Sequence, residues 1–134
     1  DAIGPSWGEA GAQHSTYEQS LRHIDAWRAR GLSKGKLVLG VPFYGYGFGE
    51  AYRANYTYRE ILQTYGAAAA EADVMGSACA GCDYLTYNGR STVSAKTQLA
   101  LQQGSGVMIW EMSQDAAAPD DLLSVIHEEI SRAR

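Results

Sequence analysis

Two apolar segments constrain the fold of this 134-residue chain more than any other feature. The first, Lys-Leu-Val-Leu-Gly-Val-Pro-Phe-Tyr, runs from Lys36 to Tyr44, and the second runs from Val107 to Trp110. Both are nearly continuous in hydrophobicity, which is typical of parallel strands that are covered on both faces. Because proline has no backbone N–H group, we expect strand pairing to end at Pro42. The two segments therefore predict buried strands of a parallel sheet.

Helical patterns lie before, between and after these strands. Ser15-Thr16-Tyr17-Glu18 matches a capping box with Ser15 as the N-cap, and we expect its helix to run to about Arg30. Thr57-Tyr58-Arg59-Glu60 is a second capping box and opens a short helix. Two more helices are expected, from 92 to 103 after a Ser91 cap, and from a first turn that contains Pro119.

The remaining segments predict loops and turns. The stretch 45–49, Gly-Tyr-Gly-Phe-Gly, is expected to be a glycine-rich loop, and Asn88-Gly89 predicts a hairpin turn after a short strand at 84–87. The order helix, strand, insertion, helix, strand, helix indicates an α/β fold built from βα units. Two strands cannot close a (β/α)8 barrel, which needs eight.

Composition excludes several classes of function. The net charge is −4 and the basic residues are scattered, so no nucleic-acid surface is expected. No apolar run approaches the ~20 residues that span a bilayer, so no membrane segment is expected. Cys79 and Cys82 form a Cys-x-x-Cys pair in a Gly/Ala/Ser loop. A local disulfide or two free thiols are favoured over a redox centre or half of a zinc site, because no histidine is near in sequence.

Aromatic and polar side chains follow both predicted strands. They are Phe43, Tyr44, Tyr46 and Phe48 after the first, and Trp110, Glu111, Gln114 and Asp115 around the end of the second. In α/β barrels the carboxyl ends of the strands form the active face. Aromatic rings there suit the C–H faces of a sugar, and the polar groups suit its hydroxyls. Packing in a core or a lid is the other reading of the same aromatic residues.

These segments also resemble a known family. Leu39-Gly40-Val41-Pro42-Phe43-Tyr44-Gly45 looks like the seventh-strand motif of family 18 glycoside hydrolases, the chitinases and their relatives. The stretch 106–111, Gly-Val-Met-Ile-Trp-Glu, with Gln114-Asp115, looks like the family's eighth strand and its exit. The stretch 87–89, with the helix around Lys96, is similar to the segment before that strand. His14-Ser15 and the helix up to Gly31 look like the sixth helix.

The resemblance implies a fold, a reaction and a set of site residues. Residues 1–134 would be the C-terminal part of a TIM (β/α)8 barrel, about strands 7 and 8, with a short insertion at 50–86 between them. The implied reaction is retaining hydrolysis of β-1,4 bonds in N-acetylglucosamine polymers such as chitin, in which the substrate's acetamido oxygen is the nucleophile. The implied substrate-binding residues are Trp110, Tyr44, Tyr46, Phe43 and Asp1, with Asp1 in a supporting catalytic role. No cofactor or metal is implied, and a polymeric substrate implies secretion.

The catalytic acid is the part of the family pattern that this sequence lacks. The family places a glutamate at the end of an Asp-x-x-Asp-x-Asp-x-Glu run, and no such run occurs here. Glu111 follows Trp110 directly, so its side chain is expected to point to the opposite face. Asp115 is expected to close the loop after the strand through a helix cap or backbone hydrogen bonds. The isolated chain is therefore expected to be inactive. A second departure from the family pattern is Tyr46, because many relatives carry an arginine at this position that would contact the sugar.

Three hypotheses follow for the function. The chain is a fragment of a chitinase-like enzyme, part of a catalytically inactive chitinase-like glycan-binding protein, or an independent small α/β domain. The first two predict exposed apolar strand edges, and hence self-association or a missing N-terminal barrel segment. The third predicts that the chain's own helices cover both faces of the strands.

Overall fold

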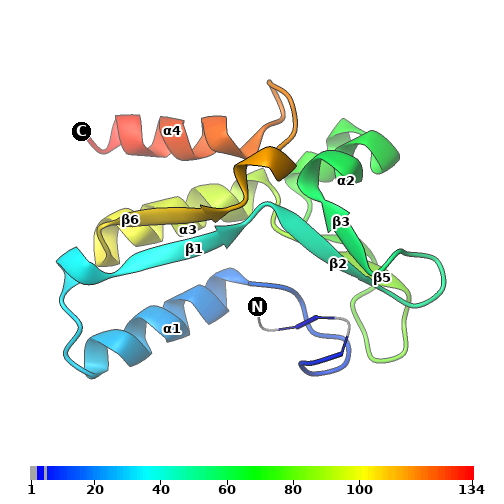
Figure 1. The fold of residues 1–134 in the computed structure, drawn as a ribbon, viewed down its shortest axis with the longest axis horizontal. Coiled ribbons are helices and arrows are strands. Elements are labelled where there is room, and N and C mark those ends of the chain that lie inside the picture. Colours follow the sequence, from blue (N-terminus) through cyan, green and yellow to red (C-terminus); the bar gives the residue numbers. More distant parts are fainter. Residues whose placement is uncertain (1–2, 5) are drawn as a thin grey trace.

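In the computed structural model, which describes residues 3–4 and 6–134, two long strands form the centre of the molecule (Figure 1). Strand β1 (Val38–Pro42) pairs in parallel with β6 (Gly106–Trp110), from Val38 opposite Gly106 to Pro42 opposite Trp110. The predicted parallel pairing is confirmed, and it ends at Pro42 as expected.

Helix α3 (Arg90–Gln103) packs on one side of this pair, and α1 (Tyr17–Ala29) and α4 (Leu122–Arg132) flank α3. Leu37, Leu39, Leu99 and Ala100 form one apolar cluster with Ile24. A larger cluster lies where the strands end and includes Val41, Phe43, Tyr58, Ile61, Tyr87 and Leu122. Both cores therefore lie on the helical side of the strands.

A second, antiparallel sheet follows β1 directly. Its strand order is β3 (Asn55–Thr57), β2 (Tyr44–Phe48), β5 (Tyr84–Thr86) and β4 (Val74–Gly76). The glycine-rich loop expected at 45–49 is therefore wrong, because most of this segment is strand β2. The glycines allow this pairing: a Cβ atom on Gly45 would lie 2.6 Å from the Thr86 carbonyl oxygen, and one on Gly47 would overlap the Arg53 carbonyl oxygen.

The caps of the first two long helices can be compared with the expectations. The N-cap of α1 is Thr16, one residue later than expected, and its box partner is Gln19, not Glu18. Ser15 adopts φ 51°, so it stands outside the helix in a left-handed conformation. The predicted box at Thr57 and Glu60 is confirmed at the start of α2 (Tyr58–Tyr65).

The later helices begin differently from the expectation. Asn88-Gly89 is not a hairpin turn, because β5 leads directly into α3. The N-cap is Gly89, not Ser91, and no side chain among the described residues caps the helix. The Asp73 carboxylate holds this helix start in place, accepting from the Gly89 N–H at 2.7 Å and the Thr92 hydroxyl at 2.6 Å. Asp121 is the N-cap of α4, so Pro119 precedes that helix and does not lie in its first turn. Short 3-10 turns occupy Lys34–Lys36, Ala67–Glu71 and Met112–Gln114.

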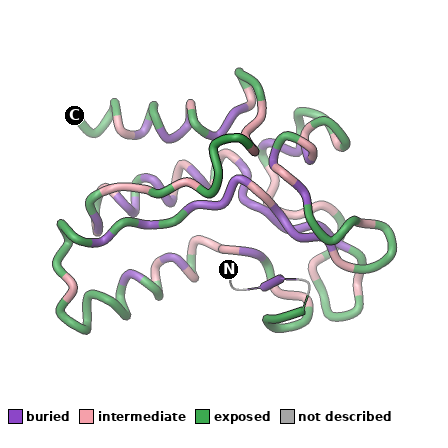
Figure 2. The backbone as a smooth tube through the Cα atoms, viewed as in Figure 1, coloured by how far each residue is buried: buried purple, intermediate pink, exposed green. Residues whose placement is uncertain are grey.

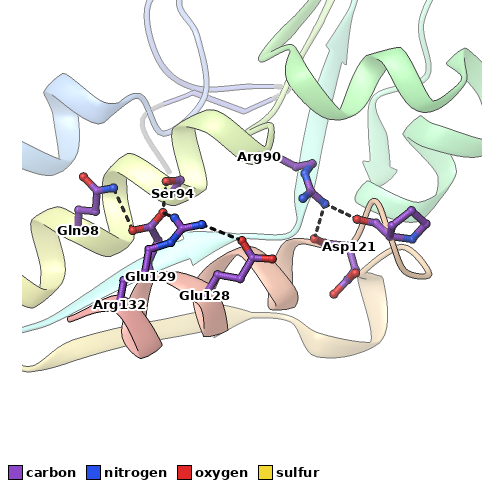
Figure 3. A network of polar contacts seen from close by, with 8 residues as sticks. Arg90, Ser94, Gln98, Asp121, Glu128, Glu129 and Arg132 are labelled. Carbon is purple, nitrogen blue, oxygen red and sulfur yellow. Dashed lines mark hydrogen bonds and ion pairs between the residues drawn. The ribbon is translucent and has the colours of Figure 1, made fainter. Parts of the chain in front are cut away.

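A polar network joins α3 to α4 (Figure 3). The Glu129 carboxylate accepts hydrogen bonds from the Ser94 hydroxyl at 2.8 Å and the Gln98 amide at 3.0 Å, and it pairs with Arg132 at 2.9 Å. The Glu129 side chain is only 8% exposed, and the hydrogen bonds from Ser94 and Gln98 lower the pKa of its carboxyl. At the other end of α3, the Arg90 guanidinium donates to the Pro119 and Asp121 carbonyl oxygens.

The side of β1 and β6 away from α3 is not covered within the described residues. Val38 is 54% exposed, Met108 is 49% exposed and Trp110 is 63% exposed, and these residues alternate with more buried neighbours (Figure 2). The expectation of strands covered on both faces is wrong for this chain, because its helices pack on one face only. Among the described residues β1 and β6 form a sheet of two strands, so the outer edge of each strand is unpaired, as the first two hypotheses predict. The uncovered face contradicts the third hypothesis.

Three further expectations concern the cysteines, metals and membranes. Cys79 and Cys82 form a disulfide, which is one of the two favoured alternatives. Residues 3–4 and 6–134 contain no group of three or more His, Cys, Asp or Glu side chains arranged to hold a metal ion. Within the same residues, every helix falls short of the length and apolar character needed to cross a bilayer.

Candidate functional site

A cavity of about 340 Å³ lies at the carboxyl ends of β1 and β6, where the chain enters the antiparallel sheet. Its lining combines four aromatic rings with amide, hydroxyl and carboxylate groups: Tyr44, Tyr46, Tyr56, Trp110, Asn55, Thr57, Glu60 and Gln114. This position matches the active face of parallel α/β folds. Aromatic rings with a few convergent polar groups are suited to an oligosaccharide, whose faces are apolar and whose edges carry hydroxyls.

Trp110 is the most exposed aromatic side chain of the cavity, at 63%. It is the last residue of β6 and lies opposite Pro42 in the parallel register. The Phe43 N–H donates to the Trp110 carbonyl oxygen at 2.7 Å, which fixes the backbone at the point where β1 ends. The indole is therefore exposed to solvent, while the Trp110 backbone is fixed by its pairing with β1.

Tyr44 and Tyr46 stand together on β2. Their ring centroids are 5.7 Å apart at 75°, an edge-to-face arrangement. Burial, together with the neighbouring Tyr46, raises the pKa of Tyr44 to about 12, and burial also raises the pKa of Tyr46. Both phenols are therefore neutral at physiological pH and can donate or accept hydrogen bonds.

The other predicted site residues are placed differently. Phe43 lies in the bend between β1 and β2 and is fully buried in the larger apolar cluster, whereas its neighbour Tyr44 lines the cavity. Direct contact between Phe43 and a ligand is therefore not expected. Phe48 stacks on Tyr84 at a centroid distance of 4.9 Å, at the far end of β2. Asp1 lies outside the described residues.

The residues that follow Trp110 have clear structural roles. Glu111 is exposed and accepts a hydrogen bond from the Ser113 hydroxyl at 2.5 Å, and it does not line the cavity. The Asp115 carboxylate accepts from the backbone N–H groups of Ala116, Leu122 and Leu123 at 2.8–3.0 Å. The expectation that Asp115 closes this loop by a helix cap or backbone hydrogen bonds is confirmed in its second form, because Asp121 is the N-cap of α4 and Asp115 accepts from three backbone N–H groups.

Sequence reasoning missed the wall that the insertion contributes. Asn55, Tyr56, Thr57 and Glu60 come from β3 and the start of α2, and they face the cavity because β3 pairs with β2. Only the capping box at Thr57 marked this segment in the sequence. The Glu60 carboxylate accepts from the Thr57 N–H at 2.8 Å and pairs with Arg53 at 3.2 Å, and these contacts lower its pKa.

Gln114 was noted in the sequence as a polar residue after the second strand, and it lies in the cavity wall. Its Oε1 atom is buried and has no hydrogen-bond partner among the described residues. A buried acceptor without a donor is costly, and it usually signals a water molecule or a ligand group. Gln114 is therefore suited to accept a hydrogen bond from a ligand hydroxyl or amide.

Two other cavities are less suited to be the principal site. One of about 510 Å³ lies between the start of α1 and the start of α3, where the Asp73 carboxylate already accepts hydrogen bonds from Gly89 and Thr92. Another, of about 340 Å³, lies between Trp7, Phe48 and the Cys79–Cys82 disulfide. Neither lies at the carboxyl ends of the parallel strands.

Comparison with known proteins places this geometry in context. The model of the family "Glycosyl hydrolases family 18" matches residues 6–115. The structure of the GH18 chitinase ChiB from the chitin utilization locus of Flavobacterium johnsoniae is similar, with 36% identity and a TM-score of 0.87. The match covers 99% of this chain and 40% of that one.

Two other solved structures are similar. A chitinase from Bacteroides thetaiotaomicron has 31% identity and a TM-score of 0.78, over 88% of this chain and 39% of that one. The chitinase-like agglutinin RobpsCRA from Robinia pseudoacacia has 26% identity and a TM-score of 0.53, over 82% and 35%. No curated protein sequence matches the chain. The chain thus spans 35–40% of the length of these structures.

Proposed function

Because this chain belongs to glycosyl hydrolase family 18, we propose that it is part of a chitinase-type barrel and supplies one wall of the sugar-binding cleft. In this proposal β1 and β6 are the seventh and eighth barrel strands, and residues 50–86 are an insertion between them. The mixed α/β fold matches chitinase structures of the family, which are TIM barrels. The single observation that carries the proposal is Trp110, an exposed indole at the carboxyl end of a parallel strand in an aromatic cavity.

The proposed reaction of the whole enzyme is hydrolysis of β-1,4 bonds between N-acetylglucosamine units with retention of configuration. In family 18 the substrate's own acetamido oxygen is the nucleophile, and a glutamic acid protonates the leaving oxygen. The cavity wall would contribute binding: Trp110 as a platform under a sugar ring, Tyr44 and Tyr46 as neutral hydroxyl partners, and Gln114 as an acceptor. Asp1 stays a proposed supporting residue.

The glutamic acid is proposed to come from another part of the barrel. Glu111 bonds Ser113 and lies outside the cavity, so it is poorly placed to protonate a bound glycoside. We therefore expect the isolated 134-residue chain to bind weakly and to have no hydrolytic activity. Turnover of a chitooligosaccharide by the purified chain would contradict this expectation.

The uncovered face of β1 and β6 supports the proposal that more of the barrel packs there. Val38 and Met108 are half exposed on neighbouring strands, and such apolar strands tend to find a partner. The partner is proposed to be the rest of the barrel or, in its absence, a second copy of the chain. Secretion is proposed on the ground that chitin is an extracellular polymer.

A second candidate function is glycan binding without hydrolysis. The observation that favours it is the similarity to a chitinase-like agglutinin. Both functions require the same aromatic cavity, and they differ in whether the whole barrel carries the acid. Assaying both binding and turnover in a chain extended by the missing barrel segment would separate them.

The first test of the shared cavity uses binding of N-acetylglucosamine oligomers to the 134-residue chain, measured by NMR chemical-shift perturbation. Saturable changes at Trp110, Tyr44 and Tyr46 that are lost in Trp110→Ala would support the proposal. The matched control is Trp27→Ala, because Trp27 on α1 is 59% exposed and does not line the cavity. Equal loss in both variants, or shifts confined to other surfaces, would contradict the placement of the site.

A further inference from the structure

A buried lysine lies behind the candidate sugar site, on helix α3. The Lys96 side chain is fully buried, which is rare for lysine unless its charge is well paired. Its ammonium donates to the Asn88 side-chain oxygen at 2.6 Å, to the Ser15 hydroxyl at 2.9 Å and to the Ser15 carbonyl oxygen. Its three donors therefore meet three oxygen atoms, and two of these belong to one residue of the turn before α1.

Asn88 holds the same turn from the other side. Its amide nitrogen donates to the His14 and Ser15 carbonyl oxygens, each at 3.1 Å. Ser15 has φ 51°, a backbone conformation that costs on the order of 1 kcal/mol for a residue other than glycine. Such a conformation persists where the surroundings determine it. Lys96 and Asn88 supply these surroundings.

The turn that they hold carries His14 to the back of the sugar site. The backbone N–H of His14 donates to the Thr86 hydroxyl at 2.8 Å, and this hydrogen bond connects the turn to β5. The imidazole is 1% exposed, and its centroid lies 5.2 Å from that of Tyr44 and 4.9 Å from that of Tyr46. Tyr44 and Tyr46 line the cavity beside Trp110. An uninterrupted set of contacts therefore connects the buried ammonium with the cavity wall.

We propose that Lys96 and Asn88 are positioning residues for the candidate sugar site: they fix the His14–Ser15 turn, and the His14 ring in turn fixes the orientation of Tyr44 and Tyr46. The part of this proposal that concerns sugar rests on the proposed function. The part that concerns the rings does not, because ring orientation can be measured in the free chain.

The decisive measurement is the set of aromatic ¹³C–¹H resonances of Tyr44 and Tyr46 in the ligand-free chain. Lys96→Met keeps most of the side-chain volume and removes all three donors. We expect the resonances of both tyrosines to shift, while those of Tyr65, on the far side of the insertion, stay in place. Leu99→Val is the matched control, because Leu99 lies on the same helix, is 3% exposed and contacts the apolar cluster rather than the turn.

A second variant protects the test against loss of folding in Lys96→Met. Thr86→Val keeps the shape of a β-strand side chain and removes the acceptor of the His14 N–H. We expect it to shift the same two tyrosines. Unchanged tyrosine resonances in a folded Lys96→Met and in Thr86→Val, or equal shifts in Leu99→Val, would overturn the proposal and leave Lys96 with a role in stability alone.

Sugar binding gives the second readout. If oligosaccharide binds the wild-type chain, Lys96→Met and Thr86→Val should weaken its affinity by roughly 2- to 30-fold, the usual range of coupling through packed contacts. Leu99→Val should leave affinity within about twofold. If no sugar binds the wild-type chain, the proposed site fails, and the ring resonances still decide whether Lys96 positions the tyrosines.

Discussion

Protonation of the buried imidazole of His14 should make the fold sensitive to mildly acidic pH. Burial is the main cause that lowers the pKa of His14 to about 3; the positive charge of Lys96 contributes to this lowering, and a backbone hydrogen bond at Ile3 acts in the opposite direction. In the unfolded chain a histidine has a pKa of about 6.5. The unfolded state therefore binds the proton first, so the stability from neutral His14 is present above about pH 6.5 and is lost as pH falls.

The size of the effect follows from the two pKa values. At about pH 5 the unfolded chain is largely protonated at this site and the folded chain is not, which costs about 2 kcal/mol relative to pH 7. For a domain of this length the change corresponds to a fall in Tm of roughly 7 °C. A pH near 5 is chosen because Asp and Glu residues contribute mainly below about pH 4.5.

The assay is urea unfolding at about pH 7 and pH 5, followed by circular dichroism, for the wild-type chain, His14→Gln and His23→Gln. His23 is exposed on α1 and serves as the matched control. The loss of about 2 kcal/mol should occur in the wild type and in His23→Gln, and be largely absent in His14→Gln. The reasoning is refuted if all three show the same pH dependence, or if the His14 ring resonances titrate near pH 6.5.

Three other predictions concern stability. Glu129→Ala should lower the free energy of unfolding by about 2 kcal/mol in urea titrations near pH 7, because two hydrogen bonds and an ion pair are lost. The difference from the wild type should shrink as pH falls through the lowered pKa of Glu129, and a constant difference down to about pH 3 would contradict this prediction. Gly11→Ala should lower the Tm more than Gly31→Ala, because a Cβ atom on Gly11 would overlap the Ala80 backbone, whereas one on Gly31 meets nothing within 4 Å. Both glycines have positive φ, so equal Tm values for the two variants would contradict this packing argument. Asp115→Ala should cost about 2 kcal/mol by thermal unfolding, because three backbone N–H groups lose their acceptor, and a loss under about 0.5 kcal/mol would count against this role.

The parallel strands could be predicted from sequence because their hydrophobicity is local information. Continuous apolar runs at 36–44 and 107–110 marked β1 and β6, and the Thr57–Glu60 box marked the start of α2. The end of pairing at Pro42 follows from the missing N–H of proline. These signals depend on a few neighbouring residues, so they can be recognised without knowledge of the tertiary structure.

Strand β2 and the cap of α3 could not be predicted in this way. Glycines alternate with aromatic residues in β2, a pattern that indicates a loop until the partner strands β3 and β5 are known to approach closely. The N-cap of α3 is Gly89, whose N–H donates to the carboxylate of Asp73, 16 residues earlier. Ser91, the expected cap, instead donates to Glu71. Both the strand conformation of β2 and the start of α3 therefore depend on contacts between residues far apart in the sequence.

The candidate site was predicted in part. Trp110, Tyr44 and Tyr46 lie together at the cavity because the ends of β1 and β6 coincide, as the parallel pairing implies. Phe43 is aromatic and adjacent to Tyr44, but the bend between β1 and β2 places it in the larger apolar cluster, where it is fully buried. Asn55 and Glu60 were missed because only the pairing of β3 with β2 brings the insertion to the cavity.

The pairing of β1 with β6 also has a consequence for how the chain folds during synthesis. The Ser105 N–H and hydroxyl both reach the Leu37 carbonyl oxygen, 68 residues earlier, so the first strand leaves the ribosome long before its partner. The His14 contact with Thr86 and the Lys96 contact with Ser15 span 72 and 81 residues. Contacts of such separation close late and slow folding. The apolar segment 37–43 therefore stays available to chaperones, and to aggregation, until residues up to about 110 have been made.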